Sequence, residues 1–212
     1  MTDKKLSGHP KKARHRNLLL EATTDIIATE GIAAASVTRI CEQAGLSRGM
    51  VHLHFANKES LLLEVARVMN VRYFSAIEEF LQGSGHSPQE KIEAVVQADL
   101  SEVLLNHKSV NIWYAFRGEA RSNNGFMKYT DTRDAALRDQ LFSAFLALSA
   151  KDNQAIMLAR DTTHGTIALL EGMWTDFFLH NDQFNRDTAQ RIVFRFLAAL
   201  YPGNFDQQGA LK

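Results

Sequence analysis

Residues 36–55 read S-V-T-R-I-C-E-Q-A-G-L-S-R-G-M-V-H-L-H-F, and this stretch decides the fold of the N-terminal part of the chain. Ser36 is a favoured N-cap, and apolar positions at helical spacing follow it. Gly45 supplies the backbone freedom for a tight turn, Leu46 can plug the corner, and Ser47 can cap a second short helix. The pattern therefore predicts two short helices joined by a glycine-containing turn, a helix-turn-helix.

The two short helices can share an apolar platform and leave one face outward. The platform candidates are Ile40, Cys41, Ala44, Leu46, Val51 and Phe55. The outward candidates are Arg48, Gly49, Met50, His52, Leu53 and His54. A helix held on such a platform can enter the roughly 12 Å wide major groove of DNA. Gly49 costs the helix about 1 kcal/mol, which indicates close approach of a phosphate or base edge. A helical hairpin without a partner is the alternative.

Helical periodicity continues along the chain, and strand alternation is almost absent. A first helix is expected to end at Gly31, and Asn57 can cap a long helix over about 58–82. Ser87-Pro88-Gln89-Glu90 is a capping box with proline at the first helical position. Further helices are expected at about 88–104, 109–121, 125–149, 152–181 and 185–200. The sequence predicts an all-α fold.

Length and composition fit a globular protein of one or two domains. Of the 212 residues, 45% are hydrophobic and 23% are charged, and only three are proline, so neither disorder nor a fibrous repeat is indicated. The most natural domain boundary lies near residue 60, which separates residues 1–60 from 61–212. Residues 1–60 hold nine Lys or Arg against six Asp or Glu. Most of this excess precedes residue 17, where a flexible basic arm could lie along a phosphate backbone.

Secretion, membrane and metal signals are absent from the sequence. No run approaches the roughly 18 apolar residues of a spanning helix, and no apolar signal core follows the basic N-terminus. The single cysteine, Cys41, excludes an intrachain disulfide and a cysteine metal cluster. We therefore expect a cytoplasmic protein that contacts no membrane and needs neither a cofactor nor a metal.

Enzyme motifs are also absent. The sequence has no G-x-S-x-G, no GxxxxGK[ST] and no H-E-x-x-H. His52 and His54 diverge by roughly 200° on a helix, so they cannot chelate as an i, i+4 pair would. Asp161 and His164 could form an acid–base pair, although a solvent-facing polar pair is favoured. We expect no catalysis. A helical adaptor that binds protein partners stays open as an alternative.

The run from Ser36 to Leu61, with I-C-E-Q-A-G-L-S-R-G, H-F and N-K-E-S-L, closely resembles the DNA-binding domain of TetR-type repressors. The resemblance implies about nine helices per subunit, with three N-terminal ones forming a reading head and the rest a ligand-binding and dimerisation domain. It also implies that Lys58 contacts a phosphate. The family commonly has tyrosine where this chain has His52 or His54. The candidate DNA-contacting residues are Ser36, Thr38, Arg39, Ser47, Arg48, Gly49, Met50, His52, Leu53, His54 and Lys58.

Three later segments resemble the C-terminal domain of BetI-type regulators, which sense choline and control its conversion to glycine betaine. They are N-I-W-Y-A-F at 111–116, A-A-L-R-D-Q-L at 135–141 and G-T-I-A-L-L-E-G-M-W at 165–174. The resemblance implies choline or a related quaternary ammonium as the effector. Arg117 departs from the pattern, since it matches an aromatic residue of the family. A guanidinium there would favour a ligand that also bears a carboxylate, such as glycine betaine or its aldehyde precursor.

Aromatic residues at helical spacing are the candidates for this effector. Glu171 precedes Trp174 by three residues, so a carboxylate and an indole share a face, which suits a cation if both point into a cavity. The same aromatic pairs are also common in protein cores. The candidate effector-binding residues are Trp113, Tyr114, Phe116, Arg117, Glu171, Trp174 and Phe178.

The last two expected helices carry more apolar side chains than one small domain covers. These are Ile156, Ile167, Leu170, Trp174, Phe177, Ile192, Val193, Phe196 and Leu200. We expect them to pair across a two-fold axis, so that the homodimer presents two recognition helices to half-sites about 34 to 36 Å apart or somewhat more. The predicted function is a ligand-responsive transcriptional regulator, a repressor, on a near-palindromic operator. A regulator of the same type that senses an unrelated ligand is the alternative.

Overall fold

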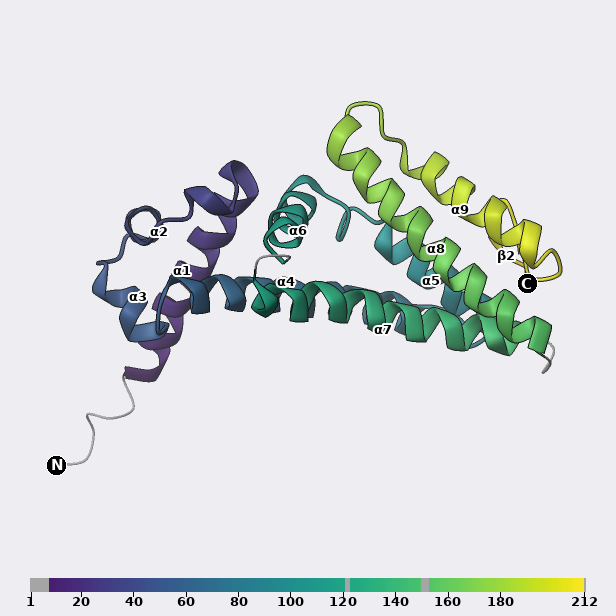
Figure 1. The fold of residues 1–212 in the computed structure, drawn as a ribbon, viewed down its shortest axis with the longest axis horizontal. Helices are drawn as coiled ribbons and strands as arrows, with labels where there is room; N and C mark the ends of the chain where they lie inside the picture. Colours follow the sequence, from purple (N-terminus) through teal and green to yellow (C-terminus); the bar gives the residue numbers. More distant parts are fainter. Residues whose placement is uncertain (1–7, 121–122, 150–152, 212) are drawn as a thin grey trace. The chain divides into compact units, whose positions relative to one another are not determined.

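The computed structural model describes residues 8–120, 123–149 and 153–211, which are mostly helical (Figure 1). The nine α-helices in these ranges are α1 (Gly8–Glu30), α2 (Val37–Ala44), α3 (Gly49–His54), α4 (Lys58–Gly83), α5 (Pro88–Asp99), α6 (His107–Glu119), α7 (Asn124–Leu148), α8 (Asn153–His180) and α9 (Arg186–Leu200). A short 3-10 helix, η1 (Ile32–Ala34), follows α1. Strands β1 (Phe205–Asp206) and β2 (Gly209–Ala210) form an antiparallel hairpin. The all-α prediction is confirmed, although the hairpin was not predicted.

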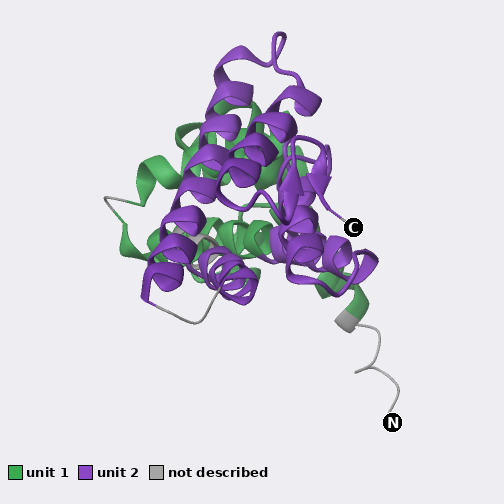
Figure 2. Ribbon diagram, turned by 90° about the vertical axis from the view of Figure 1, so that its right-hand side faces the viewer, with its two compact units in different colours: residues 1–70, 107–130 green, residues 71–106, 131–212 purple. Residues whose placement is uncertain are grey.

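The helices group into two compact units, which Figure 2 shows in two colours. Unit 1 takes its described residues from 1–70 and 107–130, and unit 2 from 71–106 and 131–212. Two of the three boundaries fall inside a helix, in α4 and in α7, and the third lies directly before α6. This division differs from the domain boundary expected near residue 60, because α6 belongs to the same unit as α1–α3. The functional boundary near residue 60 stays a prediction.

Local signals in the sequence account for most helix ends in unit 1. The Ser36 hydroxyl accepts a hydrogen bond from the Arg39 amide at 3.2 Å, as expected of an N-cap. Gly45 is left-handed, with φ 65° and ψ 33°, and its amide donates to carbonyls of the last turn of α2. The Asn57 side chain accepts from the Ser60 amide at 2.8 Å. The turn and these two caps were predicted correctly.

The cap of α3 differs from the prediction. Arg48 occupies the N-cap with helical angles, and no side chain caps this end. The Ser47 carbonyl instead accepts the Met50 amide at 2.9 Å. Because the backbone already turns helically at Arg48, the expected capping role of Ser47 is wrong.

The basic N-terminal segment is more ordered than expected. Lys4 and Lys5 lie outside the described residues, but α1 begins at Gly8 and includes Lys11 and Lys12. Residues 11–16 include the good helix formers Lys, Ala and Arg, and Pro10 lies in the first turn, where a missing amide is tolerated. The described part of the predicted flexible arm is therefore helical.

Unit 1 has one hydrophobic core, shared by the helix-turn-helix and α6. Its buried members include Leu19, Ile26, Ile40, Val51, Phe55, Leu61, Val65, Ile112, Phe116 and Phe126. Polar contacts fix α6 along α1. The side-chain amide of Asn111 donates to the Ala28 carbonyl at 2.7 Å, and the Lys108 ammonium pairs with Asp25 at 2.5 Å. The reading head, α1–α3, is thus completed by a helix from far along the chain.

In unit 2, the capping box at the start of α5 is confirmed, but the helix ends at Asp99 rather than near residue 104. The Glu90 amide donates to the Ser87 hydroxyl at 3.3 Å, and the Ser87 amide donates to the Glu90 carboxylate at 3.0 Å. After Asp99 the chain turns, and the Arg186 guanidinium donates to the carbonyls of Leu100 and Leu105, both at 2.6 Å. Arg186, which is 81 or more positions away in the sequence, therefore supplies the hydrogen bonds that these two carbonyls need.

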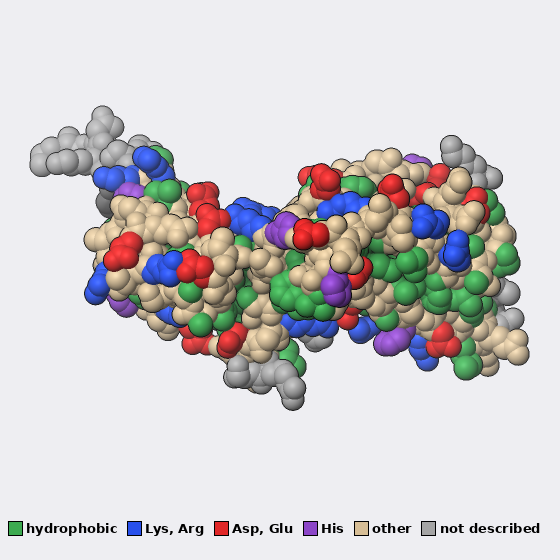
Figure 3. All heavy atoms as spheres, turned by 90° about the horizontal axis from the view of Figure 1, so that it is seen from above, with side chains coloured by type: hydrophobic (Ala, Val, Ile, Leu, Met, Phe, Trp, Pro, Cys, Tyr) green, Lys and Arg blue, Asp and Glu red, His purple; other side chains and the backbone are tan. Residues whose placement is uncertain are grey.

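Helices α8 and α9 pack closely in unit 2. A Cβ added at Gly165 would lie 2.6 Å from the Phe196 ring, so glycine permits this approach. Of the residues expected to pair between subunits, Leu170, Trp174, Phe177 and Val193 are buried within their own unit, so that part of the expectation is wrong. Ile156 and Ile192 are exposed, as is Met157, while Ile167, Phe196 and Leu200 are half-buried. Figure 3 shows hydrophobic side chains among polar ones over one face of unit 2.

The bonds of Arg186 lead to a stability prediction. Arg186→Met should lower the free energy of unfolding by about 2 kcal/mol, because two charge-assisted hydrogen bonds to half-buried carbonyls are lost. Arg186→Lys should recover only part of this loss, since an ammonium lacks the planar fork that reaches both carbonyls. Urea denaturation measures both variants. The exposed Arg191→Met is the control, expected within about 0.5 kcal/mol of wild type; an equal loss there would contradict the assignment.

Candidate DNA-binding and effector sites

The helix-turn-helix has the predicted platform. Ile40, Cys41, Val51 and Phe55 are buried, and Ala44 and Leu46 pack against the same core. The platform holds α3 through apolar contacts on one side only. The opposite side of this short helix faces outward and is open to a partner.

Four of the predicted outward residues form this open face. Arg48, Gly49, His52 and Leu53 are exposed, and Leu53 exposes 60% of its surface. A Cβ added at Gly49 would meet no atom within 4 Å. Packing within the protein therefore does not require glycine at this position, which leaves close approach of a partner as a physical reason for it.

Met50 and His54 do not face outward as expected. Met50 is half-buried against the core. Both ring nitrogens of His54 are buried without a hydrogen-bond partner, and its ring meets the edge of His15 on α1 at 6.2 Å. Burial, followed by the charges of His15, Lys12 and Arg16, lowers the pKa of His54 below its ordinary value. DNA contacts from Met50 and His54 stay a prediction.

The remaining candidates flank the open face. Ser36, Arg39 and Ser47 are exposed, while Thr38 and Lys58 are half-exposed. The Arg39 guanidinium is engaged with Glu30. Lys58 is the first residue of α4. All eleven candidates thus lie at exposed or half-exposed positions at the starts of α2, α3 and α4 or along α3, although the ring nitrogens of His54 are buried.

A charged cluster ties α1, the end of α3 and α4 together. Arg16 lies over the Phe55 ring at 5.2 Å and pairs with Glu64. Arg67 donates two hydrogen bonds to the same carboxylate, both at 2.8 Å. Hydrogen bonds from Arg67 and then Arg16, opposed by burial, lower the pKa of Glu64 to about 2. This cluster fixes the helices on which the open face of α3 depends.

Four effector candidates lie on α6 in unit 1. Phe116 is buried in the core, with its ring 5.2 Å from that of Phe126. Trp113, Tyr114 and Arg117 are half-buried. The Arg117 guanidinium lies over the Trp113 ring at 5.8 Å. One face of Trp113 therefore already carries a cation from the protein itself.

The other three candidates lie on α8 in unit 2. Trp174 is buried and donates from its indole nitrogen to Asp99 Oδ2 at 2.9 Å. Glu171 is half-buried, whereas Phe178 exposes 44% of its surface. Its neighbour Phe177 is the buried ring, edge-on to Phe184 at 5.3 Å.

Sequence reasoning missed Asp99 and Tyr73. Asp99 is fully buried, and its other oxygen accepts the Tyr73 hydroxyl at 2.7 Å. The available signal was an acidic residue at an apolar position, seven residues after Ile92 on the same helix face.

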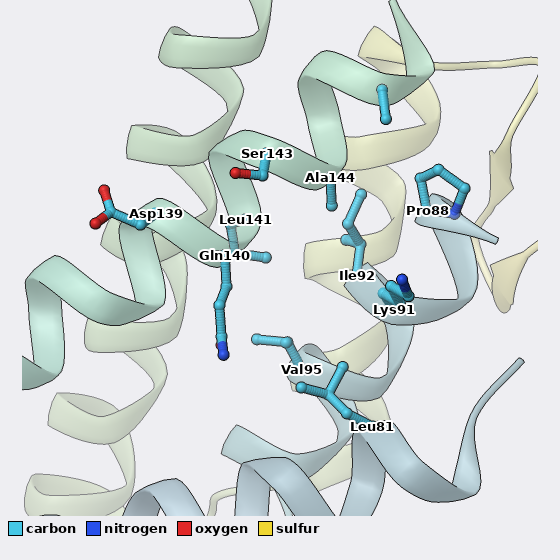
Figure 4. Close-up of a pocket in the computed structure, with 11 residues that line it drawn as sticks. Leu81, Pro88, Lys91, Ile92, Val95, Asp139, Gln140, Leu141, Ser143 and Ala144 are labelled. Atoms are coloured by element: carbon cyan, nitrogen blue, oxygen red, sulfur yellow. The ribbon is translucent and has the colours of Figure 1, made fainter. Parts of the chain in front are cut away.

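Unit 2 also contains an apolar pocket of about 490 Å³. Its walls come from α4, α5 and α7, including Leu81, Ile92, Val95, Leu141 and Ala144. In Figure 4 the Gln140 side chain extends from α7 toward α4 and α5, whereas the Asp139 carboxylate points away from them. The volume lies in the range of small-molecule sites, about 300–1,000 Å³. No sequence motif indicated this pocket.

The described residues contain neither a metal site nor a membrane-spanning helix. No group of three or more His, Cys, Asp or Glu side chains there could hold a metal ion. Asp161 and His164 are both exposed. No helix in the described ranges is long and apolar enough to cross a membrane.

A helix-turn-helix with an open recognition helix, followed by a helical body with a small-molecule pocket, is the architecture of a transcriptional regulator that binds DNA. Residues 19–65 match the family model for bacterial regulatory proteins of the tetR family. Residues 88–202 match the model for the C-terminal domain of BetI-type transcriptional repressors. The chain belongs to the TetR family of transcriptional regulators, with a BetI-type C-terminal domain.

Curated relatives agree with this assignment. The chain is 27% identical over 183 residues to the HTH-type transcriptional regulator BetI of Pectobacterium carotovorum, covering 86% of this chain and 91% of the relative. It is 26% identical to BetI of Stenotrophomonas maltophilia, with 86% and 90% covered. These families and relatives are regulators and not enzymes.

Solved structures share the fold. A transcriptional regulator from Pseudomonas aeruginosa PAO1 superposes with a TM-score of 0.77 at 24% identity, covering 94% of each chain. A regulator from Saccharomonospora viridis, solved in complex with choline, superposes with a TM-score of 0.75 at 17% identity, covering 87% of this chain and 96% of its own.

The open face of α3 leads to a prediction about DNA. Arg48→Ala should weaken binding to a preferred duplex by about 1 to 3 kcal/mol and relax base preference. Lys58→Ala should weaken binding to all duplexes alike. It should also reduce the slope of log binding constant against log salt concentration by about one. Fluorescence anisotropy at several salt concentrations measures both, on a duplex selected from random DNA. Lys91→Ala, an exposed change in unit 2, is the control. Unaltered binding by both head variants would exclude this face.

Glu64 leads to a prediction about pH. Its pKa falls from an ordinary 4.5 to about 2 on folding, so its stabilising effect is complete above pH 4.5 and is lost as the pH falls toward 2. Glu64→Gln should therefore be less stable than wild type at pH 7, and the difference should shrink between these two pH values. Urea denaturation across pH measures it, with the exposed Glu42→Gln as control. A difference that stays constant with pH would refute the role of the Glu64 charge.

Proposed function

We propose that the chain is a repressor that binds a near-palindromic operator as a homodimer and whose DNA affinity changes when it binds choline or a related quaternary ammonium. The observation that carries the DNA-binding part is the open face of α3, held by the buried platform beneath it. We expect the protein to act in the cytoplasm, where the operator DNA lies.

Within the head, the exposed residues divide by chemistry. Arg48 and His52 carry donors that reach base edges, and Leu53 offers apolar contact to a thymine methyl group. Gly49 lets a phosphate or base edge approach the backbone. Ser36, Thr38, Arg39, Ser47 and Lys58 position the head through phosphate or backbone contacts. Met50 and His54 complete the candidate set from the half-buried side of α3.

Residues 61–212 would supply effector binding and dimerisation. Ile156 and Met157 on α8 and Ile192 on α9 expose apolar side chains, and Phe196 is half-exposed beside Gly165. Regulators of this family bind operator DNA as dimers, and a symmetric contact through α8 and α9 would cover these side chains. The dimer presents two copies of α3 to two half-sites.

The choline part of the proposal rests on chemistry and on similarity. The curated relatives are named BetI, and one structural neighbour was solved with choline. Each unit offers aromatic side chains that attract a quaternary ammonium: on α6 in unit 1 and, with Glu171, on α8 in unit 2. Arg117 favours a ligand that also bears a carboxylate, such as glycine betaine.

Effector binding at α6 would act directly on the head. Trp113 and Tyr114 share a helix with Ile112 and Phe116, which lie in the core of unit 1. A ligand that shifts α6 therefore changes the support of α1 through the Asn111 and Lys108 contacts. Such a shift changes the population of DNA-competent heads.

A second candidate effector is an unrelated apolar molecule in the α4–α5–α7 pocket. Apolar walls dominate that pocket. Its polar lining residues are Lys91, Asp139, Gln140 and Ser143, and the Asp139 carboxylate points away from α4 and α5 (Figure 4). This arrangement favours a largely apolar ligand over choline at that position.

Thermal unfolding and operator binding together test the effector. At 100 times its dissociation constant a ligand stabilises the protein by about 2.7 kcal/mol, which raises the melting temperature. We expect choline to give this shift and to change operator affinity, with glycine betaine and indole as the comparison ligands. A shift with indole alone would favour the apolar pocket. Salt-independent or absent DNA binding would instead favour a protein adaptor.

A further inference from the structure

The first two turns of α1 carry positive charge that the described part of the fold does not pair. Residues 8–20 contain no aspartate or glutamate, and of their lysine and arginine side chains Arg16 is the one engaged with a described carboxylate, that of Glu64. The others are exposed and form no ion pair with a described residue. These side chains are named here the α1 basic surface: Lys11, Lys12 and Arg14.

Helical spacing directs part of this surface toward α3, which packs against α1 in unit 1 (Figure 1). Lys12 and His15 stand at i, i+7 and i, i+4 from Leu19, so they share its face of α1. Leu19 is buried in the core below the helix-turn-helix, whereas two turns earlier the same face carries basic side chains. The face that supports α3 therefore continues past the core as a cationic face.

Contacts with His54 show where the cationic face meets α3. The rings of His15 and His54, the last residue of α3, meet edge-on with their centroids 6.2 Å apart. Burial and then the charge of His15 lower the pKa of His54, and Lys12 contributes next, which requires Lys12 to lie nearby. The α1 basic surface thus borders the C-terminal end of α3.

This surface holds more available positive charge than the candidate contact residues on α2–α4. Among those candidates Arg39 is engaged with Glu30, and the remaining lysine and arginine are Arg48 and Lys58. Like charges close together in the sequence repel one another, and an anionic partner relieves that repulsion. Because the surface adjoins the helix that would enter a major groove, the anionic partner that fits both is DNA.

We propose that the α1 basic surface binds DNA phosphates that border the groove entered by α3, and that it supplies the larger share of the salt-dependent affinity for the operator. This inference rests on the proposed operator binding and deepens it, by adding contacts outside α2–α4. Phosphate contacts position a protein without reading bases. The surface on α1 therefore sets affinity, whereas the open face of α3 sets sequence preference.

DNA binding by charge variants of the whole chain tests the inference. The triple variant Lys11→Gln, Lys12→Gln, Arg14→Gln removes the charges and keeps good helix formers. Each neutralised phosphate contributes about 0.9 to the slope of log binding constant against log salt concentration. The triple variant should therefore lose about 2 to 3 in slope per bound subunit and about tenfold or more in affinity at low salt. The loss should be equal on the selected duplex and on random DNA.

Two further variants separate local charge from other effects. A charge-preserving variant keeps the number of cations on α1 and should keep the wild-type slope: Lys11→Arg, Lys12→Arg and Arg14→Lys. A variant with the same loss of net charge at exposed positions of unit 2 should also keep that slope: Arg72→Gln, Lys91→Gln and Arg138→Gln.

Each other outcome overturns a defined part. A wild-type slope in the triple variant would refute the α1 basic surface and leave DNA binding by α3 standing. Lost preference for the selected duplex at an unchanged slope would also refute it, because the contacts would then read bases. If the triple variant does not fold, Arg14→Gln alone decides, with an expected change in slope of about one. A wild type that binds no duplex would overturn the operator proposal together with this inference.

Discussion

The reading head depends on the contact between α6 and α1, the helix on which α2 and α3 pack. A domain of about 60 residues buries only about 60% of the surface of its unfolded chain, so α1–α3 have little core of their own. Ile112 and Phe116 of α6, with Ala120 directly after it, extend that core, and Phe126 at the start of α7 closes it. The orientation of α3 is therefore a property of a larger unit that includes a helix bearing effector candidates.

Ion pairs within unit 1 also hold the helices of the head in place and add no net charge. Arg16, Arg67 and Arg39 are engaged with glutamates inside unit 1, so much of the positive charge near the head fixes helices. Arg48 and Lys58 remain near the ends of α3 and α4 that face outward. A chain of zero net charge can thus present Arg48 and Lys58 where a phosphate backbone would lie, because Glu30 and Glu64 pair with other arginines.

The sequence predicted features that depend on neighbouring residues. The caps at Ser36, Asn57 and Ser87 and the turn at Gly45 form through contacts within a few positions, so their residue types are sufficient evidence. The end of α5 depends on Arg186, and the burial of His54 depends on α1, and neither partner can be found by periodicity. The helical start at Gly8 was not predicted, because basic charge alone does not indicate backbone conformation. Asp99 was missed because its partners lie on two other helices.

Native-state hydrogen exchange of the whole chain tests most directly whether α6 and the reading head form one cooperative unit. Amides of a shared core open together and converge on one opening free energy as denaturant rises. We predict that the amides of Ile112 and Phe116 in α6 converge with those of Leu19 and Ile26 in α1. Exchange of the α6 amides through a separate opening of low free energy, with the protection of α1 unchanged, would contradict the account.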